Sequence, residues 1–229
     1  MRAQTRPPGL APRATGYMAA VGADATAAAL IPNRPSLSRL REAAAGCRAC
    51  ELWRKGTRTV FGEGSPDAPV MLVGEQPGDR EDLIGRPFVG PAGALLDRAL
   101  AKAGIPPDDV YLTNVVKHFN WEARGKRRIH RKPNLGHIRA CRPWLDAEVK
   151  LVNPEVLVLL GATAAQSLLG RDFKVTEHRG ELAESPLAPL VMATVHPPSI
   201  LRARDSATRH TQLEAFVRDL RVVAGAMRR

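Results

Sequence analysis

The feature that most constrains the fold is a set of short apolar runs that alternate with segments of helical periodicity. The runs have the length of strands and end in glycine, proline or polar residues. They are Pro69–Gly74, Val110–Val116, Glu155–Gly161 and Leu190–Pro198, separated by helical segments that include Gly90–Ile105, Asn134–Val152 and Ala162–Gly170. Strands that are apolar on both faces and separated by helices are typical of a parallel sheet covered on both sides. We therefore predict a three-layer α/β/α fold with a central, mainly parallel, four-stranded sheet.

Length and composition indicate a single domain without a membrane segment. A chain of 229 residues is long enough for a full core. Residues 1–35 combine Pro-Pro, scattered arginines and an alanine-rich patch, so we expect a disordered or loosely attached extension before a folded domain of residues 36–229. No apolar run reaches the roughly 20 residues needed to cross a bilayer. Three cysteines make a poor disulfide framework, so we expect a reducing, cytoplasmic compartment. We also expect the protein to be a monomer.

Positive charge is concentrated in one stretch of the chain. The net charge is +11, and the segment Lys117–Lys132 contains seven Lys or Arg residues against the single acidic residue Glu122. Such a concentration favours a polyanionic partner, most simply nucleic acid. The alternative is a solvated basic loop that serves solubility alone.

The segment Gly74–Asp97, "GEQPGDREDLIGRPFVGPAGALLD", carries the most specific pattern. It places the carboxylate of Glu75 in a tight turn at the end of a strand, and the ring of Phe88 shortly before a glycine-bracketed helix start. Glycine lets the backbone approach a ligand closely, and a helix N-terminus offers free N–H groups to an anion. The pattern indicates a pocket with one acid and one stacking ring, although an ordinary strand–turn–helix with a solvated glutamate would look similar.

Three separated motifs, "GEQPGDREDLIGRPFVGPAG", "YLTNVVK" and "VHPPS", resemble in this order the uracil-DNA glycosylase superfamily, and especially its iron–sulfur family 4 branch. The resemblance covers roughly Leu37 to Leu220. The additional "KRRIH" after "NVVKHF" is similar to the UdgX-type proteins, in which a histidine of this loop bonds covalently to DNA after uracil is excised. The resemblance implies the uracil-DNA glycosylase fold and uracil-containing DNA as the partner, with single strands favoured over duplex.

The resemblance also implies roles for five residues at the ends of the strands. Phe88 would stack on the flipped uracil, and Asn114 would read its polar edge, since one amide both donates and accepts. His196 would hydrogen-bond the uracil oxygen that gains negative charge as the bond to C1′ breaks, which is the electrostatic core of the reaction. Gln76 would add a backbone N–H to the pocket. Glu75 matches the catalytic carboxylate, which would stabilise the sugar cation, orient water or poise His130.

His130 is the residue on which the expected outcome of the reaction depends. An oxocarbenium-like C1′ accepts any nearby nucleophile, and a free imidazole is mostly neutral at pH 7. The flanking Arg127, Arg128 and Arg131 should disfavour imidazolium further. Together with Lys126, these arginines would hold the neighbouring phosphates and so bring the nucleophile to the sugar. We expect a covalent adduct between His130 and the abasic sugar, with an enzyme that acts once.

Two other functions fit parts of the same pattern. In the first, the protein is an ordinary turnover glycosylase, in which Glu75 activates water and His130 contacts DNA or solvent. In the second, it is a metal-containing DNA-binding protein without catalytic activity, which would bind DNA in a salt-sensitive manner but release no uracil. The intact set Glu75, Phe88, Asn114 and His196 argues against the second alternative.

Three cysteines and one histidine form a candidate metal site. Cys47 and Cys50 form a Cys-x-x-Cys pair, and Cys141 lies far downstream. Three thiolates suit a metal ion or an iron–sulfur cluster in a reducing cell. By resemblance, His118 occupies the place of a fourth cysteine ligand, so we expect a [4Fe-4S] cluster held by Cys47, Cys50, His118 and Cys141. A zinc site with the same four ligands, or three buried thiols beside a hydrogen-bonded histidine, are the alternatives.

Overall fold

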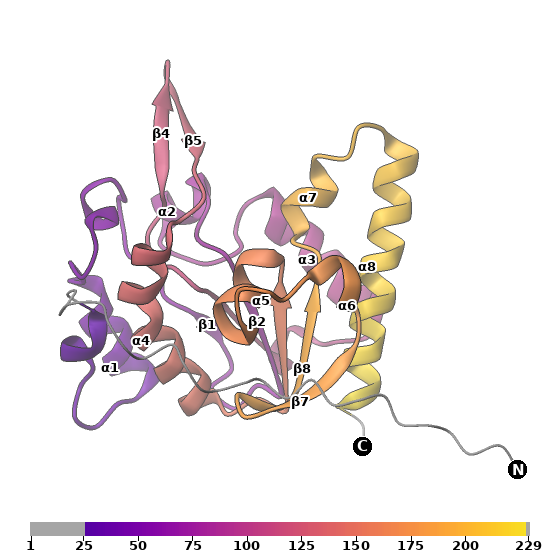
Figure 1. The fold of residues 1–229 in the computed structure, drawn as a ribbon, viewed down its shortest axis with the longest axis horizontal. Helices are drawn as coiled ribbons and strands as arrows, with labels where there is room; N and C mark the ends of the chain where they lie inside the picture. The colour runs from indigo at the N-terminus through magenta and orange to yellow at the C-terminus, as the bar shows by residue number, and fades with distance from the viewer. Residues whose placement is uncertain (1–25, 228–229) are drawn as a thin grey trace, which may run out of the picture.

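The computed structural model describes residues 26–227 and has a mixed sheet at its centre (Figure 1). Six strands follow the order β1-β3-β2-β6-β8-β7. The inner four, β3, β2, β6 and β8, are parallel, and β1 and β7 pair antiparallel at the two edges. The strands of this sheet are β1 (Glu63–Gly64), β2 (Val70–Gly74), β3 (Val110–Asn114), β6 (Val156–Leu160), β7 (Leu182–Ser185) and β8 (Ala188–Thr194). The predicted parallel core of four strands is confirmed, and the two short edge strands extend it.

Helices cover both faces of the sheet, as the apolar character of the strands predicts. Alternate residues of a strand point to opposite faces, so that Met71 and Val73 join one buried cluster while Val70 and Leu72 join the other. On the first face lie α1 (Leu37–Ala45), α4 (Leu135–Val152) and α5 (Ala162–Leu169), and on the second α3 (Pro91–Ala103), α7 (Pro197–Leu201) and α8 (Ser206–Ala226). The remaining helices are α2 (Asp79–Ile84), α6 (Val175–His178) and the 3-10 turns η1 (Ala27–Leu30), η2 (Glu51–Arg54) and η3 (Pro107–Asp109). No helix within residues 26–227 is long and apolar enough to cross a membrane.

The start of the packed domain differs from the sequence-based boundary at Ser36. Residues 1–25 of the expected extension lie outside the described part of the chain. The segment Ala27–Leu30, which also belongs to the expected extension, forms η1 and packs against α4. Ala27 is fully buried in the core on that side of the sheet. Burial of a small side chain here is a tertiary contact that local composition does not reveal.

The basic segment that the sequence suggests as a loop is a β-hairpin. Strands β4 (Trp121–Arg124) and β5 (Arg127–His130) pair antiparallel, with Gly125 at a positive φ of 59° in the turn. Glycine adopts this left-handed conformation without steric cost. The hairpin projects beyond the main sheet in Figure 1. His130 pairs with Trp121, the first residue of β4, so it lies at the base of the hairpin, away from the tip.

Candidate active site

Three of the predicted site residues lie at the carboxyl ends of neighbouring parallel strands. Glu75 directly follows β2, Asn114 is the last residue of β3, and His196 follows β8. Gly74 pairs with Asn114 across β2 and β3, and the Gly161 N–H donates to Thr194 O at 2.8 Å, which joins the ends of β6 and β8. Parallel α/β sheets form their ligand sites at this edge. The structure therefore gathers at one edge residues that are far apart in the sequence.

Gly74 makes room for the two side chains that would contact a base. A Cβ at this position would lie 2.4 Å from Asn114 Oδ1 and 2.9 Å from Phe88 Cζ. Both distances are shorter than van der Waals contact, so any larger residue would displace the amide or the ring. Because Gly74 has no side chain, the Asn114 amide and the Phe88 ring can both lie against the end of β2. A site for a planar polar ring needs such an amide and such an aromatic ring close together.

Phe88 has a backbone conformation that a bulky residue rarely adopts. Its φ of 54° lies in the left-handed region, which costs about 1–3 kcal/mol for a non-glycine residue. The carbonyl of Phe88 lies where a Cβ of Gly93 would be, at 1.6 Å, so α3 approaches this turn closely because Gly93 has no side chain. The buried Glu81 carboxylate accepts a hydrogen bond from the Gly90 N–H at 2.7 Å. These contacts hold the loop that presents the ring.

The carboxylate of Glu75 lies between His130 and Thr163. Its Oε1 is 3.2 Å from His130 Nε2, and its Oε2 accepts a hydrogen bond from the Thr163 hydroxyl. Burial pushes the pKa of Glu75 upward, but the contacts with His130 and Thr163 and the nearby His196 outweigh it, so the pKa lies below its ordinary value. Glu75 is therefore ionised at neutral pH.

His196 is held in a neutral form beside the same groups. Burial lowers its pKa to about 4, even though the Glu75 carboxylate acts in the opposite direction. Gly161, with φ at +91°, lies beneath it, and a Cβ there would be 2.8 Å from the Cβ of His196. His196 therefore stands in the pocket as a neutral hydrogen-bonding group across the neutral pH range.

The side chain of Gln76 connects the pocket to the base of the hairpin. Its Nε2 donates to the carbonyls of Asn120 and Arg131, at 3.2 and 3.1 Å, and its Oε1 accepts from the Asn120 N–H at 3.2 Å. One amide thus bonds to both chain segments that flank β4 and β5. The sequence suggested a backbone N–H directed into the pocket, whereas the structure adds this side-chain contact with the segment that carries His130.

Gln76→Ala is expected to loosen the base of the hairpin without changing the base pocket. Each hydrogen bond contributes about 1 kcal/mol net. In single-turnover assays, the loss of three should therefore lower the rate of any step that needs His130 in place by tenfold or more. A step that depends only on Phe88, Asn114 and His196 should stay within a few-fold. Gln212→Ala on α8 is the matched control. Equal slowing of both steps in Gln76→Ala would show that Gln76 acts on the pocket as well.

The four cationic residues predicted to bind phosphate differ in their surroundings. Lys126 and Arg127 are exposed near the tip of the hairpin. Arg131 is exposed and pairs with Glu122 at 2.8 Å. Arg128 turns inward and bonds to Asp79 Oδ1 and Asp82 Oδ2, at 2.5 and 2.6 Å. The guanidinium of Arg128 therefore connects the hairpin to α2. The charged group that contacts the His130 ring is the Glu75 carboxylate, not Arg128.

Lys117, which opens the basic run in the sequence, is fully buried. Its Nζ bonds to the Glu148 carboxylate of α4, to the Thr113 hydroxyl and to Asn114 O at 2.8 Å. A buried lysine needs such partners, because an uncompensated charge in the interior is very costly. Its charge is unavailable to DNA and instead supports the backbone of Asn114. No local pattern indicated that Lys117 and Glu148, on separate elements, would meet.

The predicted metal ligands come from three segments on one side of the molecule. Cys47 and Cys141 are buried, Cys50 is half-buried, and Cys47 and His118 line a common cavity of about 170 Å³. Among the described residues, no three His, Cys, Asp or Glu side chains are arranged to hold a single metal ion. The ligands of a four-iron cluster bind different corners and stand farther apart than those of one ion. The described residues therefore show no assembled site, either for a single zinc ion or for a cluster.

Two of the candidate sulfur ligands accept hydrogen bonds, and His118 Nε2 lies 2.9 Å from the Thr59 hydroxyl. The Lys117 N–H donates to Cys141 Sγ at 3.2 Å, and Trp144 Nε1 donates to Cys47 Sγ at 3.4 Å, as donors to ligand sulfurs do. Burial raises the pKa of Cys141 to about 12 in the absence of a metal, and the nearby Cys50 and Cys47 act in the same direction. Burial lowers the pKa of His118, which keeps its imidazole neutral, as a ligand must be.

Comparison with known proteins identifies the family. The model of the "Uracil DNA glycosylase superfamily" matches residues 61–221. The chain belongs to this superfamily. The type-4 uracil-DNA glycosylase of Thermotoga maritima is 39% identical over 169 residues, which cover 73% of this chain and 84% of that protein. The type-4 enzyme of Sulfurisphaera tokodaii is 38% identical over 151 residues, 64% of this chain and 66% of that protein.

The similarity to type-4 relatives supports uracil-DNA glycosylase function for this superfamily member. The matched region begins at Phe61 and includes the ends of β2, β3 and β8 with the residues Glu75, Asn114 and His196. Cys47 and Cys50 lie before it. Thr163 is a further residue of the candidate site, and no sequence motif indicated it. The available signal was a polar residue shortly after the end of a buried strand. The alanines on both sides of Thr163 made this segment look like an ordinary helix start.

Proposed function

We propose that this protein excises uracil from DNA and then becomes joined covalently to the abasic sugar through His130. The observation that carries the proposal is the 3.2 Å approach of His130 Nε2 to Glu75 Oε1 at the edge where Asn114, Phe88 and His196 also lie. This approach brings a potential nucleophile to the catalytic carboxylate. We further propose that the protein is a cytoplasmic monomer. Its glycosylase domain would follow an N-terminal extension.

Recognition of uracil begins with extrusion of the nucleotide, at a cost of about a few kcal/mol, which is least for a base that is already unpaired. The ring of Phe88 then stacks on the base. The amide of Asn114 donates to and accepts from its polar edge, while the buried Lys117 holds the carbonyl of Asn114 in place. Asn114 and Phe88 both lie against Gly74, so the two side chains proposed to contact the base are neighbours before the base enters.

Cleavage separates charge between the base and the sugar. The electron pair of the N–C1′ bond leaves with uracil, and C1′ becomes an oxocarbenium-like cation. The neutral imidazole of His196 stabilises the anion by a hydrogen bond to the uracil oxygen that gains charge. The ionised Glu75 stabilises the positive sugar. Each role agrees with the direction in which the surroundings move the pKa of that group.

Capture of the sugar follows in the same pocket. A lone pair of the His130 ring forms a bond to C1′, which gives the ring a positive charge, and the ring then loses its remaining N–H proton to water. The Glu75 carboxylate favours the positive ring as it forms, in the way that a buried acid supports a catalytic histidine. The product is an uncharged N-substituted imidazole attached to the abasic sugar.

An ordinary turnover glycosylase is the second candidate function, and the similarity to the type-4 enzymes favours it equally. In that mechanism, Glu75 orients a water molecule toward C1′ and His130 contacts DNA. Incubation with single-stranded uracil-containing DNA followed by a denaturing gel separates the two. A heat-stable shifted band in a one-to-one amount with released uracil is expected for the adduct. Release of many uracils per protein without such a band would establish turnover and overturn the proposal.

The pKa directions predict how base release depends on pH. The pKa of Glu75 is below its ordinary value and that of His196 is about 4, so both groups keep their active forms from neutral pH down to about pH 5. The single-turnover rate of uracil release by the native protein is expected to be flat over this range and to fall as His196 protonates near its pKa. An inflection near pH 6.5 that disappears in His196→Gln would contradict the assigned neutral form.

We propose that Cys47, Cys50, His118 and Cys141 hold a [4Fe-4S] cluster. When bound, such a cluster would be structural, joining the segment after α1 to the loop after β3, and the proposed chemistry needs no redox step. The purified protein is expected to be brown, with visible absorption and about four irons per chain. Cys47→Ser should lose the colour and lower the thermal midpoint. Stoichiometric zinc without visible absorption would contradict this assignment and leave the uracil site untouched.

A further inference from the structure

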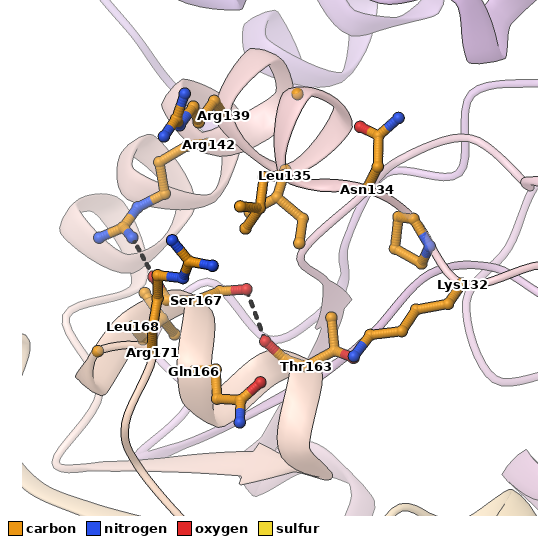
Figure 2. A pocket seen from close by; sticks show the side chains of 14 residues that line it. Lys132, Asn134, Leu135, Arg139, Arg142, Thr163, Gln166, Ser167, Leu168 and Arg171 are labelled. Carbon is orange, nitrogen blue, oxygen red and sulfur yellow. Dashed lines mark hydrogen bonds between the residues drawn. The ribbon is translucent and has the colours of Figure 1, made fainter. Parts of the chain in front are cut away.

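A groove of about 1160 Å³ runs between the first half of α4 and helix α5, next to the proposed active site (Figure 2). It is larger than the roughly 300–1,000 Å³ of a small-molecule pocket, so its size suits a segment of a polymer. Lys132, two residues after His130, lies at one end. Thr163, whose hydroxyl bonds to Glu75, lines it as well. A chain lying in this groove would therefore continue into the active site.

The charge of the groove has one sign. The described residues that line it include the four cations Lys132, Arg139, Arg142 and Arg171 and no Asp or Glu. Within residues 26–227, neither Lys132 nor Arg171 has a carboxylate partner, and both are exposed. Arg142 instead bonds to Asp146 and to Ser167 O at 2.7 Å, so it bridges α4 and α5. The complementary ligand is a polyanion.

Apolar side chains lie between the charged ends. Figure 2 shows Arg139, Arg142 and Arg171 toward one end, Lys132 toward the other, and Leu135 between them. The Leu135 side chain is on the α4 side and is 44% exposed, and Leu168 lines the groove from α5. A single nucleic-acid strand has the same alternation, because its phosphates are anionic and the faces of its bases are apolar. A duplex lacks it, since its bases are stacked on one another.

We propose that this groove binds the single DNA strand on one side of the flipped uracil, with Arg171 and Lys132 on its phosphates and the leucines against a base. The inference rests on the proposed function, because it takes the occupant to be the strand that enters the active site. Charge argues against the chain's own residues 1–25 as the occupant, since they contain three arginines and one aspartate. Binding of a strand in this groove would favour single-stranded substrates, through contacts that paired bases cannot make.

The test compares Arg171→Glu with Arg218→Glu, which reverses an exposed arginine on α8. The probes are uracil-containing single strands that extend only 5′ of the uracil, only 3′ of it, or by one nucleotide on each side. Arg171→Glu is expected to weaken binding, measured by fluorescence anisotropy, about 10-fold for one of the two extended strands. Its salt slope for that strand should fall by about 0.7 per lost phosphate contact. Uracil release from the shortest strand should be unchanged.

The outcomes separate the groove from the proposed function. Equal affinities of the native protein, Arg171→Glu and Arg218→Glu for both extended strands would overturn the groove assignment. So would equal losses for the 5′ and 3′ extensions, because a groove on one side of the site contacts only one of them. A native protein that releases no uracil from any strand would overturn the proposed function, while the anisotropy comparison would still decide whether the groove binds DNA.

Discussion

His130→Ser is expected to abolish the heat-stable protein–DNA band and to leave uracil excision in place. The serine side chain lacks a ring that reaches C1′, and the space it opens beside Glu75 admits water. The pocket formed by Phe88, Asn114 and His196 is untouched, so cleavage continues and water captures the sugar. The variant should therefore release more than one uracil per molecule. Denaturing gels and a time course of uracil release measure both effects.

His178→Ser on α6 is the matched control, because His178 pairs with Glu181 and is not one of the proposed site residues. It should form the band as the native protein does. An undiminished band in His130→Ser would refute the nucleophilic role and direct attention to another residue of the pocket. Loss of both the band and excision would instead assign His130 to the cleavage step.

His196→Ala is expected to have the largest effect on excision itself. Removal of a single donor to a developing anion typically lowers the rate by roughly 100-fold to 1,000-fold. Because capture of the sugar requires prior cleavage, the covalent band should form more slowly by the same factor. The single-turnover rate at saturating protein reports this change, while the affinity for uracil-containing DNA should change little.

His196→Gln provides the conservative comparison, since an amide retains a hydrogen-bond donor. It should recover part of the lost rate, whereas His196→Ala should not. Near-native excision in His196→Ala, or a loss confined to DNA affinity, would show that His196 does not act on the leaving base. Circular dichroism of both variants controls for folding, because a Cβ of Gly161 would lie close to this residue and the site is tightly packed.

Much of the fold could be predicted from the sequence because buried parallel strands are apolar throughout. The runs that end near Gly74, Asn114 and Thr194 were recognisable for this reason, and so was the expectation that their carboxyl ends share an edge. The short edge strands β1 and β7 were not predicted. Their residues are partly exposed or polar, and their pairing depends on neighbours in the sheet.

The basic segment shows where prediction from composition fails. A run of lysines and arginines was interpreted as a loop whose charges face DNA. In the structure it is a hairpin, Arg128 pairs with Asp79 and Asp82, and Lys117 is buried against Glu148. A cation gains stability from a carboxylate wherever the fold brings the two together, and the partners here are 31 to 49 residues apart. The residues next to a cation in the sequence therefore do not indicate which distant carboxylate it contacts.

The amino-acid sequence by itself determined the layered α/β architecture and the identity of the groups at the strand ends, because period and residue type are local properties. Tertiary structure alone decided that His130 meets Glu75, that Gln76 clamps the hairpin, and that Thr163 joins the site. It also decided which cations remain exposed for a polyanion and which support the backbone. These outcomes depend on the packing of distant segments, where the cost of burying an unpaired polar group selects the partners.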